Sequence, residues 1–136
     1  MSLFNVFDTA ASGMSAQSLR LNTTASNLAN ADSVSSSAET AYRAKAPVFE
    51  AIRQGLAGAS TSGVRVTGIS ESQSPVGSHL EPGNPLADEQ GYVYTPNVNP
   101  VDELVNMISA SRAYQNDVEV MNSAKQLMLK TLELGR

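Results

Sequence analysis

The residues that could carry out acid–base or metal chemistry in this chain are few. The one histidine, His79, stands in a stretch of Ser, Gly and Pro residues that is typical of turns. A lone loop histidine is ordinarily solvated, because catalysis needs a second group placed beside it. The adjacent acids Asp88 with Glu89 and Asp102 with Glu103 lack the spacing of a calcium-binding loop, and the chain has no Cys. We therefore predict no catalytic residue and no metal site.

The nine glycines do not form a phosphate-binding loop either. Neither Gly-x-x-x-x-Gly-Lys-Ser/Thr nor Gly-x-Gly-x-x-Gly occurs. The serines have only one histidine in the whole chain as a partner base. We predict a protein without a cofactor that is not an enzyme. The enzymatic alternative, a cell-wall-cleaving factor, would need an acid placed in a cleft, and no residue stands out for that role.

Composition indicates a chain that covers its surface with partners. Only 16% of the 136 residues are charged, against roughly 25% in an ordinary soluble domain. Four Tyr, three Phe and no Trp offer little material for a large core. The net charge of −4 argues against a nucleic-acid partner. No window approaches the roughly 18 apolar residues of a membrane span, so we predict no direct membrane span.

The N-terminus does not resemble a cleaved signal peptide, which begins with basic residues and continues as an unbroken apolar stretch. The first basic residue is Arg20, and Asp8 interrupts the short apolar start. If the protein leaves the cytoplasm, we expect export without a conventional cleaved signal.

Proline divides the chain into three segments. All six prolines lie between Pro47 and Pro100, and seven of the nine glycines lie between Gly55 and Gly91. This distribution predicts helix, then irregular or β structure, then helix. We expect a mainly α fold with an N-terminal coiled-coil helix in 1–34, a β-rich or extended middle in 35–98 and a C-terminal coiled-coil helix in 99–136. The two long helices would pair as an antiparallel coiled-coil hairpin around a small β-hairpin or extended loop.

The first helix should span about residues 3–30. Large apolar residues recur every seven positions, with smaller ones on a companion row. The seam is Phe7, Met14, Leu21 and Leu28, and the companion row is Phe4, Ala11, Ser18 and Ala25. The segment 22–27 is polar and uncharged, and Ser, Thr and Asn are indifferent helix formers. Such a helix is either a weak surface helix or one that is buried in an assembly and poorly ordered before it arrives there.

The last helix is better specified. Asn99 is a suitable N-cap, Pro100 suits the first helical position, and Gly135 can end the helix. Two rows are spaced by seven: Met107, Tyr114, Met121 and Met128, and Leu104, Ser111, Val118, Lys125 and Leu132. The methionines indicate either an adaptable binding face or ordinary core filling. The middle segment offers short strand-like runs at 42–52, 64–66 and 92–94, separated by glycine-rich turns at 55–58 and 82–85.

Motifs in both flanks resemble one known family. SGMSAQ at 12–17, RLN at 20–22 and ASNLANA at 25–31 are similar to the N-terminal motif of the axial rod and hook proteins of the bacterial flagellum. PNVNP at 96–100 and SRAYQ at 111–115 are similar to the C-terminal helix motif of the same family. In the middle, YRAK at 42–45, GVRV at 63–66 and EPGNPLAD at 81–88 resemble the proximal rod proteins. The stretch 55–62 contributes nothing to the resemblance.

The resemblance implies a structural subunit of the proximal rod in the flagellar basal body. Such proteins polymerise helically into a hollow drive shaft that crosses the periplasm, and the flagellar type III apparatus exports them. Their terminal helices fold on incorporation. The implied partners are copies of the chain itself, other proximal rod proteins, the adaptor between the rod and the MS ring, and the distal rod segment.

We predict that the assembly interface lies on the two helices. The rival class is a soluble helical binding module such as an export chaperone or adaptor, which would need a charged outer surface that residues 1–38 do not provide. The predicted interface residues are Phe4, Phe7, Ala11, Met14, Leu21, Asn22, Asn27, Leu28, Asn30, Leu104, Met107, Ile108, Arg112, Tyr114, Val118, Met121, Met128 and Leu132.

Overall fold

The computed structural model describes residues 3–54 and 61–135. Two long helices flank four strands in the order helix, four strands, helix. Their bounds are α1 Leu3–Ala29, β1 Lys45–Gln54, β2 Thr61–Glu71, β3 Gly77–Leu80, β4 Tyr92–Thr95 and α2 Pro100–Leu134. The predicted turn at 55–58 lies outside the described residues.

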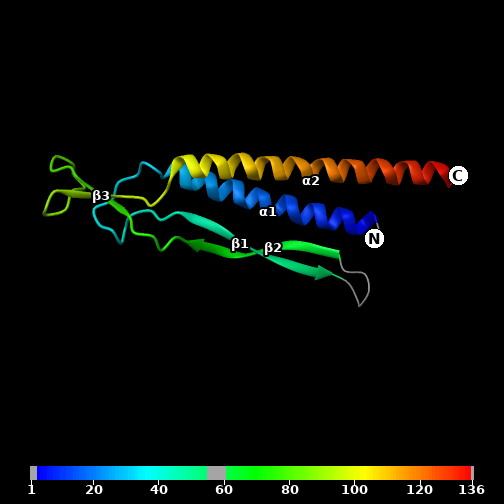
Figure 1. Ribbon diagram of the computed structural model, residues 1–136, viewed down its shortest axis with the longest axis horizontal. Coiled ribbons are helices and arrows are strands. Elements are labelled where there is room, and N and C mark those ends of the chain that lie inside the picture. Colours follow the sequence, from blue (N-terminus) through cyan, green and yellow to red (C-terminus); the bar gives the residue numbers. More distant parts are fainter. Residues whose placement is uncertain (1–2, 55–60, 136) are drawn as a thin grey trace.

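The two helices lie side by side and run in opposite directions (Figure 1). Gly13 lies against Asp117, and Arg20 donates a hydrogen bond to Asn106. Residues with higher numbers in α1 therefore contact residues with lower numbers in α2, as in an antiparallel pair. The β1–β2 hairpin runs along another side of α1, while the shorter β3–β4 hairpin lies near the start of α2 (Figure 1). The predicted pairing of the terminal helices is confirmed.

The boundaries of α2 follow from its capping residues. The Asn99 side chain accepts a hydrogen bond from the Val101 N–H at 3.0 Å, and Pro100 occupies the first turn, where its missing N–H costs nothing. At the other end the Gly135 N–H donates to the Thr131 carbonyl. The predicted caps of this helix are confirmed.

The middle segment contains two separate antiparallel hairpins. In the first, β1 pairs with β2 from Lys45 opposite Glu71, with a bulge between Val48 and Phe49. In the second, β3 pairs with β4 from Gly77 opposite Thr95 to Leu80 opposite Tyr92. The sequence did not predict β3, because its short run of Gly, Ser, His and Leu has no apolar alternation. β3 forms a strand because its backbone pairs with β4, which contains two Tyr residues, and not because of an apolar pattern of its own.

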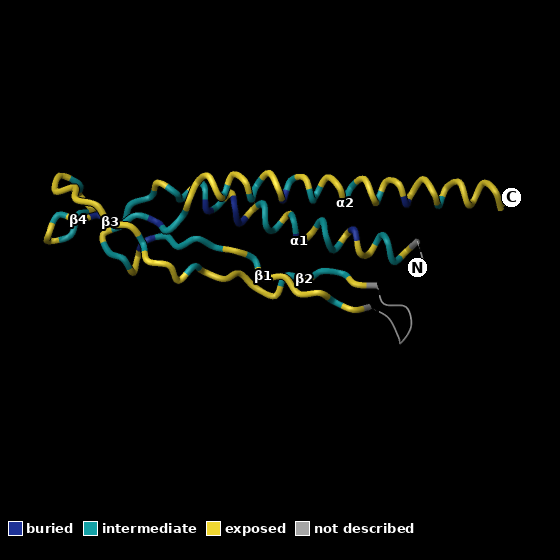
Figure 2. Tube along the Cα trace, viewed as in Figure 1, coloured by how far each residue is buried: buried dark blue, intermediate teal, exposed yellow. Residues whose placement is uncertain are grey.

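Few residues are buried (Figure 2), and those that are buried are mostly small. Within the described residues, Val93 is the largest apolar side chain that is fully buried. The other buried apolar residues are Ala10, Ala16, Ala41, Ala110 and Ala124. Because alanine lets helix backbones approach closely but buries little apolar area, this core contributes modest hydrophobic stabilisation.

The companion row that the heptad pattern predicted for α1 is not packed. Its members Phe4, Ala11, Ser18 and Ala25 are all exposed, and the row that faces α2 contains Ala10 and Gly13 instead. The reason is that α1 contacts two elements, α2 and the β1–β2 hairpin, so its buried surface covers two faces. A heptad pattern for a two-helix seam assumes a single partner.

Candidate assembly interface

A buried asparagine ties the end of α1 to the start of β1. Asn27 is 1% exposed, and its Oδ1 accepts hydrogen bonds from the Tyr42 hydroxyl and the Lys45 N–H, both at 2.9 Å. Its Nδ2 donates to the Lys45 carbonyl at 2.8 Å. The Tyr42 hydroxyl also lies 3.1 Å from Ser26 Oγ. All the polar atoms of this amide are therefore directed to its own chain.

A second asparagine joins the two hairpins to the segment before α2. The Asn97 Oδ1 accepts from the Ala44 N–H at 2.7 Å, and its Nδ2 donates to the Ser74 carbonyl at 2.8 Å. Arg43 donates to the carbonyls of Ser72 and Ser74, at 3.2 Å each. The residues around Asn27 and Asn97, which we call the joint, fix the relative positions of α1, the β1–β2 hairpin and α2.

The polar segment 22–27 of α1 therefore has a structural role that propensity alone does not reveal. Thr23, Thr24 and Asn27 are buried, and the Thr23 hydroxyl donates to the Leu19 carbonyl at 2.8 Å. These residues weaken the helix in isolation, but they satisfy hydrogen bonds where it meets the rest of the chain.

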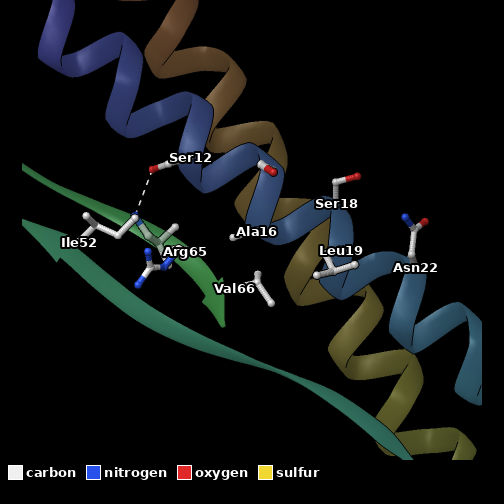
Figure 3. A pocket seen from close by; sticks show the side chains of 10 residues that line it. Ser12, Ala16, Ser18, Leu19, Asn22, Ile52, Arg65 and Val66 are labelled. Carbon is white, nitrogen blue, oxygen red and sulfur yellow. Dashed lines mark hydrogen bonds between the residues drawn. The ribbon is translucent and has the colours of Figure 1, made fainter. Parts of the chain in front are cut away.

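An open groove of about 640 Å³ lies between α1 and the β1–β2 hairpin (Figure 3). Its apolar wall includes Leu19 from the helix with Ile52 and Val66 from the hairpin. Ser12 closes one end, where its hydroxyl accepts from the Val64 N–H at 3.1 Å. The groove has no cluster of ionisable groups, so it favours packing of a side chain over chemistry.

The predicted interface residues fall into three groups. The exposed ones lie on faces that this chain leaves uncovered: Phe4, Ala11, Asn22, Leu104, Ile108, Arg112 and Leu132. The half-buried ones line or flank the contact between the chain's own elements: Phe7, Met14, Leu21, Leu28, Asn30, Met107, Tyr114, Val118, Met121 and Met128. Asn27 alone is fully buried, within the joint.

The structure adds exposed apolar residues that the predicted interface set omits. On α2 they are Val101, Val105, Val120, Leu127, Leu129 and Leu134, and on the hairpins and their loop they are Val48, Phe49, Ile69, Leu80, Leu86 and Tyr92. Of the α2 members, Leu127, Leu129 and Leu134 stand out in the sequence as apolar residues that a single helix pair leaves uncovered and that need a further partner. The hairpin members depend on strand pairing, which the sequence left open.

The acidic residues of the β3–β4 loop hold that loop in shape. Hydrogen bonds from the backbone N–H groups of Tyr92 and Gln90 lower the pKa of Asp88, whose Oδ1 accepts both at 2.9 Å. Hydrogen bonds from Asn84 and His79 lower the pKa of Glu81. The carboxylates are therefore used structurally, and His79 Nε2 lies 3.1 Å from Glu81 Oε1 in an exposed contact.

No group of three or more His, Cys, Asp or Glu side chains in residues 3–54 and 61–135 could hold a metal ion. Neither of the described helices combines the length and hydropathy that crossing a bilayer requires.

An elongated helix pair that has a thin core and exposes its large apolar residues is typical of a subunit in a larger structure. Two family models match the same two flanks: "Flagella basal body rod protein" over residues 7–35 and "Flagellar basal body rod FlgEFG protein C-terminal" over residues 89–134. Fold and matches together define a structural protein of the flagellar basal-body rod.

Curated relatives narrow this class. The chain is 55% identical to the flagellar basal-body rod protein FlgC of Escherichia coli O157:H7 and 54% identical to that of Salmonella typhimurium, in both cases over the whole of both chains. It is 43% identical to FlgC of Aquifex aeolicus over 98% of this chain and 97% of that protein. The chain belongs to the FlgC family of flagellar basal-body rod proteins. It is a structural protein and not an enzyme, as the sequence predicted.

Proposed function

We propose that this rod subunit belongs to the proximal rod and polymerises helically into a hollow shaft that crosses the periplasm, transmits torque and encloses the export channel. The terminal segments 1–34 and 99–136 form its core domain, and the segment 35–98 reaches toward adjacent subunits. Its partners are copies of itself, other proximal rod proteins, the adaptor at the MS ring and the distal rod segment. The flagellar type III apparatus exports it without a cleaved signal.

The observation that carries this proposal is the exposure of large apolar residues on α2. Four apolar residues lie within two turns of one another at the start of α2, and each is between 51% and 66% exposed: Val101, Leu104, Val105 and Ile108. A contiguous apolar surface of this kind on an elongated chain favours burial against a partner. The predicted interface residues Leu104 and Ile108 belong to this surface.

We also propose that, away from the joint, the two terminal helices are poorly ordered in the free subunit and fold on incorporation. The fully buried residues that the structure describes in the two helices are only alanines, threonines and Asn27, and a helix pair with so little buried apolar area is marginal in water. Ordering at the moment of assembly places the entropic cost there and discourages premature polymerisation. Far-UV circular dichroism of the free protein tests this, and a fully helical monomer with a cooperative melt would contradict it.

The substitution Ile108→Asp separates assembly from folding, because the side chain is 56% exposed in the single chain. We expect the free variant to keep the wild-type circular dichroism spectrum, since no contact within the chain is lost. We expect it to be absent from isolated basal bodies and the cells to be non-motile, since a buried unpaired carboxylate is costly at an interface.

The matched control is Ile108→Val, which keeps the apolar surface and should support normal motility. Leu21→Asp would be a poorer test, because Leu21 is half-buried and its loss would also disturb the chain itself. Normal basal bodies with Ile108→Asp would show that this face of α2 is not an interface.

A further inference from the structure

Two of the sequence motifs meet at a single contact, which we call the clip (Ser12, Gly63 and Val64). The Ser12 hydroxyl of α1 accepts a hydrogen bond from the Val64 N–H of β2 at 3.1 Å (Figure 3). The same hydroxyl donates to the Thr9 carbonyl at 2.7 Å. Because its one proton is directed back to its own helix, its lone pairs are left for the strand.

Gly63 allows the strand to approach the helix this closely. A Cβ at this position would lie 3.2 Å from Ser12 Oγ and 3.7 Å from Ser12 Cβ. The first of these distances is shorter than ordinary van der Waals contact, so a larger residue would push the strand away from the hydroxyl. Gly68 on the same strand has open space where its Cβ would be. A glycine in a strand often marks the close approach of another backbone, and of these two glycines only Gly63 does so.

The clip also satisfies a backbone group at the free edge of the hairpin. β1 and β2 form a two-stranded ribbon, in which alternate N–H groups of each strand point away from the partner strand. Val64 lies opposite Ala51 in the register, but its N–H bonds to Ser12 of α1. An N–H at the edge of such a ribbon otherwise has only water as a partner. Ser12 therefore recognises the backbone of β2, whatever side chain stands at position 64.

The clip and the joint are two separate attachments of the hairpin to α1. The joint holds the base of the hairpin, where Asn27 bonds to Lys45. The clip lies about four turns earlier on α1, roughly 22 Å away at 1.5 Å per residue. Between them lies the open groove, so helix and hairpin are not packed tightly along their whole length. The joint alone would let the hairpin swing about its base, and the clip removes that freedom.

We propose that Ser12 and Gly63 are positioning residues that couple the β1–β2 hairpin to α1, so that helix and hairpin move as one body in the assembled rod. The proposal rests on the proposed transmission of torque and names the contact inside one subunit through which load passes. A hairpin hinged at one point yields to load, whereas a hairpin held at two points passes it on. Neither residue belongs to the exposed apolar surface of α2, so variants of the clip should still be incorporated.

A disulfide tests whether the clip is closed in the rod, because the chain contains no Cys. The 3.7 Å between Ser12 Cβ and a Cβ at position 63 lies within the range of about 3.5–4.5 Å that disulfides require. In isolated basal bodies, a chain with Ser12→Cys and Gly63→Cys should form an intramolecular link on mild oxidation, as mass spectrometry detects. Incorporated chains without this link would overturn the proposal.

The control for the disulfide combines Gly63→Cys with Ser18→Cys. Position 18 lies roughly 9 Å further along the axis of α1 at 1.5 Å per residue. Because that separation exceeds the Cβ distance of a disulfide, this pair should give at most about a tenth of the linked yield of the 12–63 pair. Equal yields from both pairs would show that the hairpin has no fixed position on α1.

Breaking the clip tests whether it holds the hairpin. Ser12→Ala removes the acceptor of one hydrogen bond, so the Val64 amide of the incorporated subunit should exchange about fivefold faster. Gly63→Val should also speed this exchange, because its side chain crowds Ser12 Oγ. The matched controls are Ser18→Ala and Gly68→Val, the same changes at two exposed positions, and they should leave the exchange unchanged. Equal exchange rates in variants and controls would show that the clip does not hold the hairpin.

Swimming under load separates coupling from folding. Basal bodies should contain wild-type amounts of Ser12→Ala and of Gly63→Val. As the medium is made more viscous, these strains should lose a larger fraction of their swimming speed than the two control strains lose. The oxidised chain with Ser12→Cys and Gly63→Cys regains the second attachment and should swim like the wild type, and reduction with dithiothreitol should remove that rescue.

Two outcomes of the swimming experiment would overturn the proposal. Equal load dependence in all strains, with normal incorporation, would show that the clip carries no load while leaving the rod function intact. Absence of both clip variants from basal bodies, where both control variants are incorporated, would show that the clip serves folding or assembly instead of coupling.

Discussion

Replacing Asn27 by alanine should open the joint without altering any exposed surface. The side chain makes three hydrogen bonds to its own chain, two through Oδ1 and one through Nδ2, and it is 1% exposed. Alanine removes all three and leaves the N–H and carbonyl of Lys45 without these partners. Tyr42 keeps its contact with Ser26 at 3.1 Å, so its hydroxyl retains one partner.

The magnitude follows from those three bonds. Each intramolecular hydrogen bond contributes about 1 kcal/mol net, so their loss should cost about 3 kcal/mol of local stability. Because about 1.4 kcal/mol corresponds to a factor of ten, this converts to about a hundredfold loss of protection for amides that exchange through opening of the joint.

Hydrogen–deuterium exchange of the free protein is the assay, because it reports local opening whatever the order of the distant helix ends. Peptides that cover the start of β1 and the end of α1 should lose protection, while the β3–β4 hairpin should change little. The control is Asn22→Ala, the same substitution five residues earlier in α1 at an exposed position. If Asn27→Ala changes protection no more than Asn22→Ala does, the joint does not hold these elements together.

Two further predictions follow from single contacts. Gly13→Ala would place a Cβ 2.6 Å from Asp117 Oδ2, the far end of a side chain that can rotate away. Because alanine favours a helix interior over glycine by about 0.5–1 kcal/mol, we expect no net loss of stability in the α1–α2 contact, and Asp117→Ala should make Gly13→Ala more stabilising, as a double-mutant cycle by hydrogen exchange of the incorporated subunit measures. The lowered pKa of Asp88, caused first by the Tyr92 N–H, means that its ionised form stabilises the loop. That stabilisation is fully present above the pKa of the carboxyl in the unfolded chain, and it is lost as the pH falls through the lower pKa of the folded chain. Protection of the Tyr92 amide should therefore fall in acid. Asp88→Asn should abolish that pH dependence. A Tyr92 amide whose protection is insensitive to acid would contradict the assignment.

The helices and their antiparallel pairing could be predicted because their signals are local. Proline is absent from both flanks, Asn99 and Pro100 mark the start of α2, and apolar residues recur at helical spacing. The packed face of α1 could not be predicted in the same way. The close approach of Gly13 to Asp117 joins two residues that are far apart in the sequence. The second buried face of α1 depends on the β1–β2 hairpin, which requires the two strands to pair.

The hydrogen bonds of the joint could not be predicted from the sequence either, although the sequence contains the residues that make them. The sequence places Asn27 with the assembly interface because this residue lies in a motif on the first helix. Its actual partners, Tyr42 and Lys45, lie 15 and 18 residues away across a turn whose geometry no local pattern specifies. A buried asparagine and an exposed one look alike until the elements around them are placed, as the contrast with Asn22 shows.

The chain buries mainly small side chains and leaves many large apolar side chains exposed, and this distribution suits it to assembly. Its best-buried functional group is the amide of Asn27, while Leu134 is 88% exposed at the end of α2. Hydrogen bonds specify geometry but contribute modest net free energy, whereas burial of large apolar side chains is the dominant favourable term in folding and association. A chain that uses its hydrogen bonds to set its own shape and exposes the leucines of α2 would, under the proposed polymerisation, obtain most of its apolar burial from neighbours. In that proposal the joint defines the shape of the subunit, and assembly completes its stability.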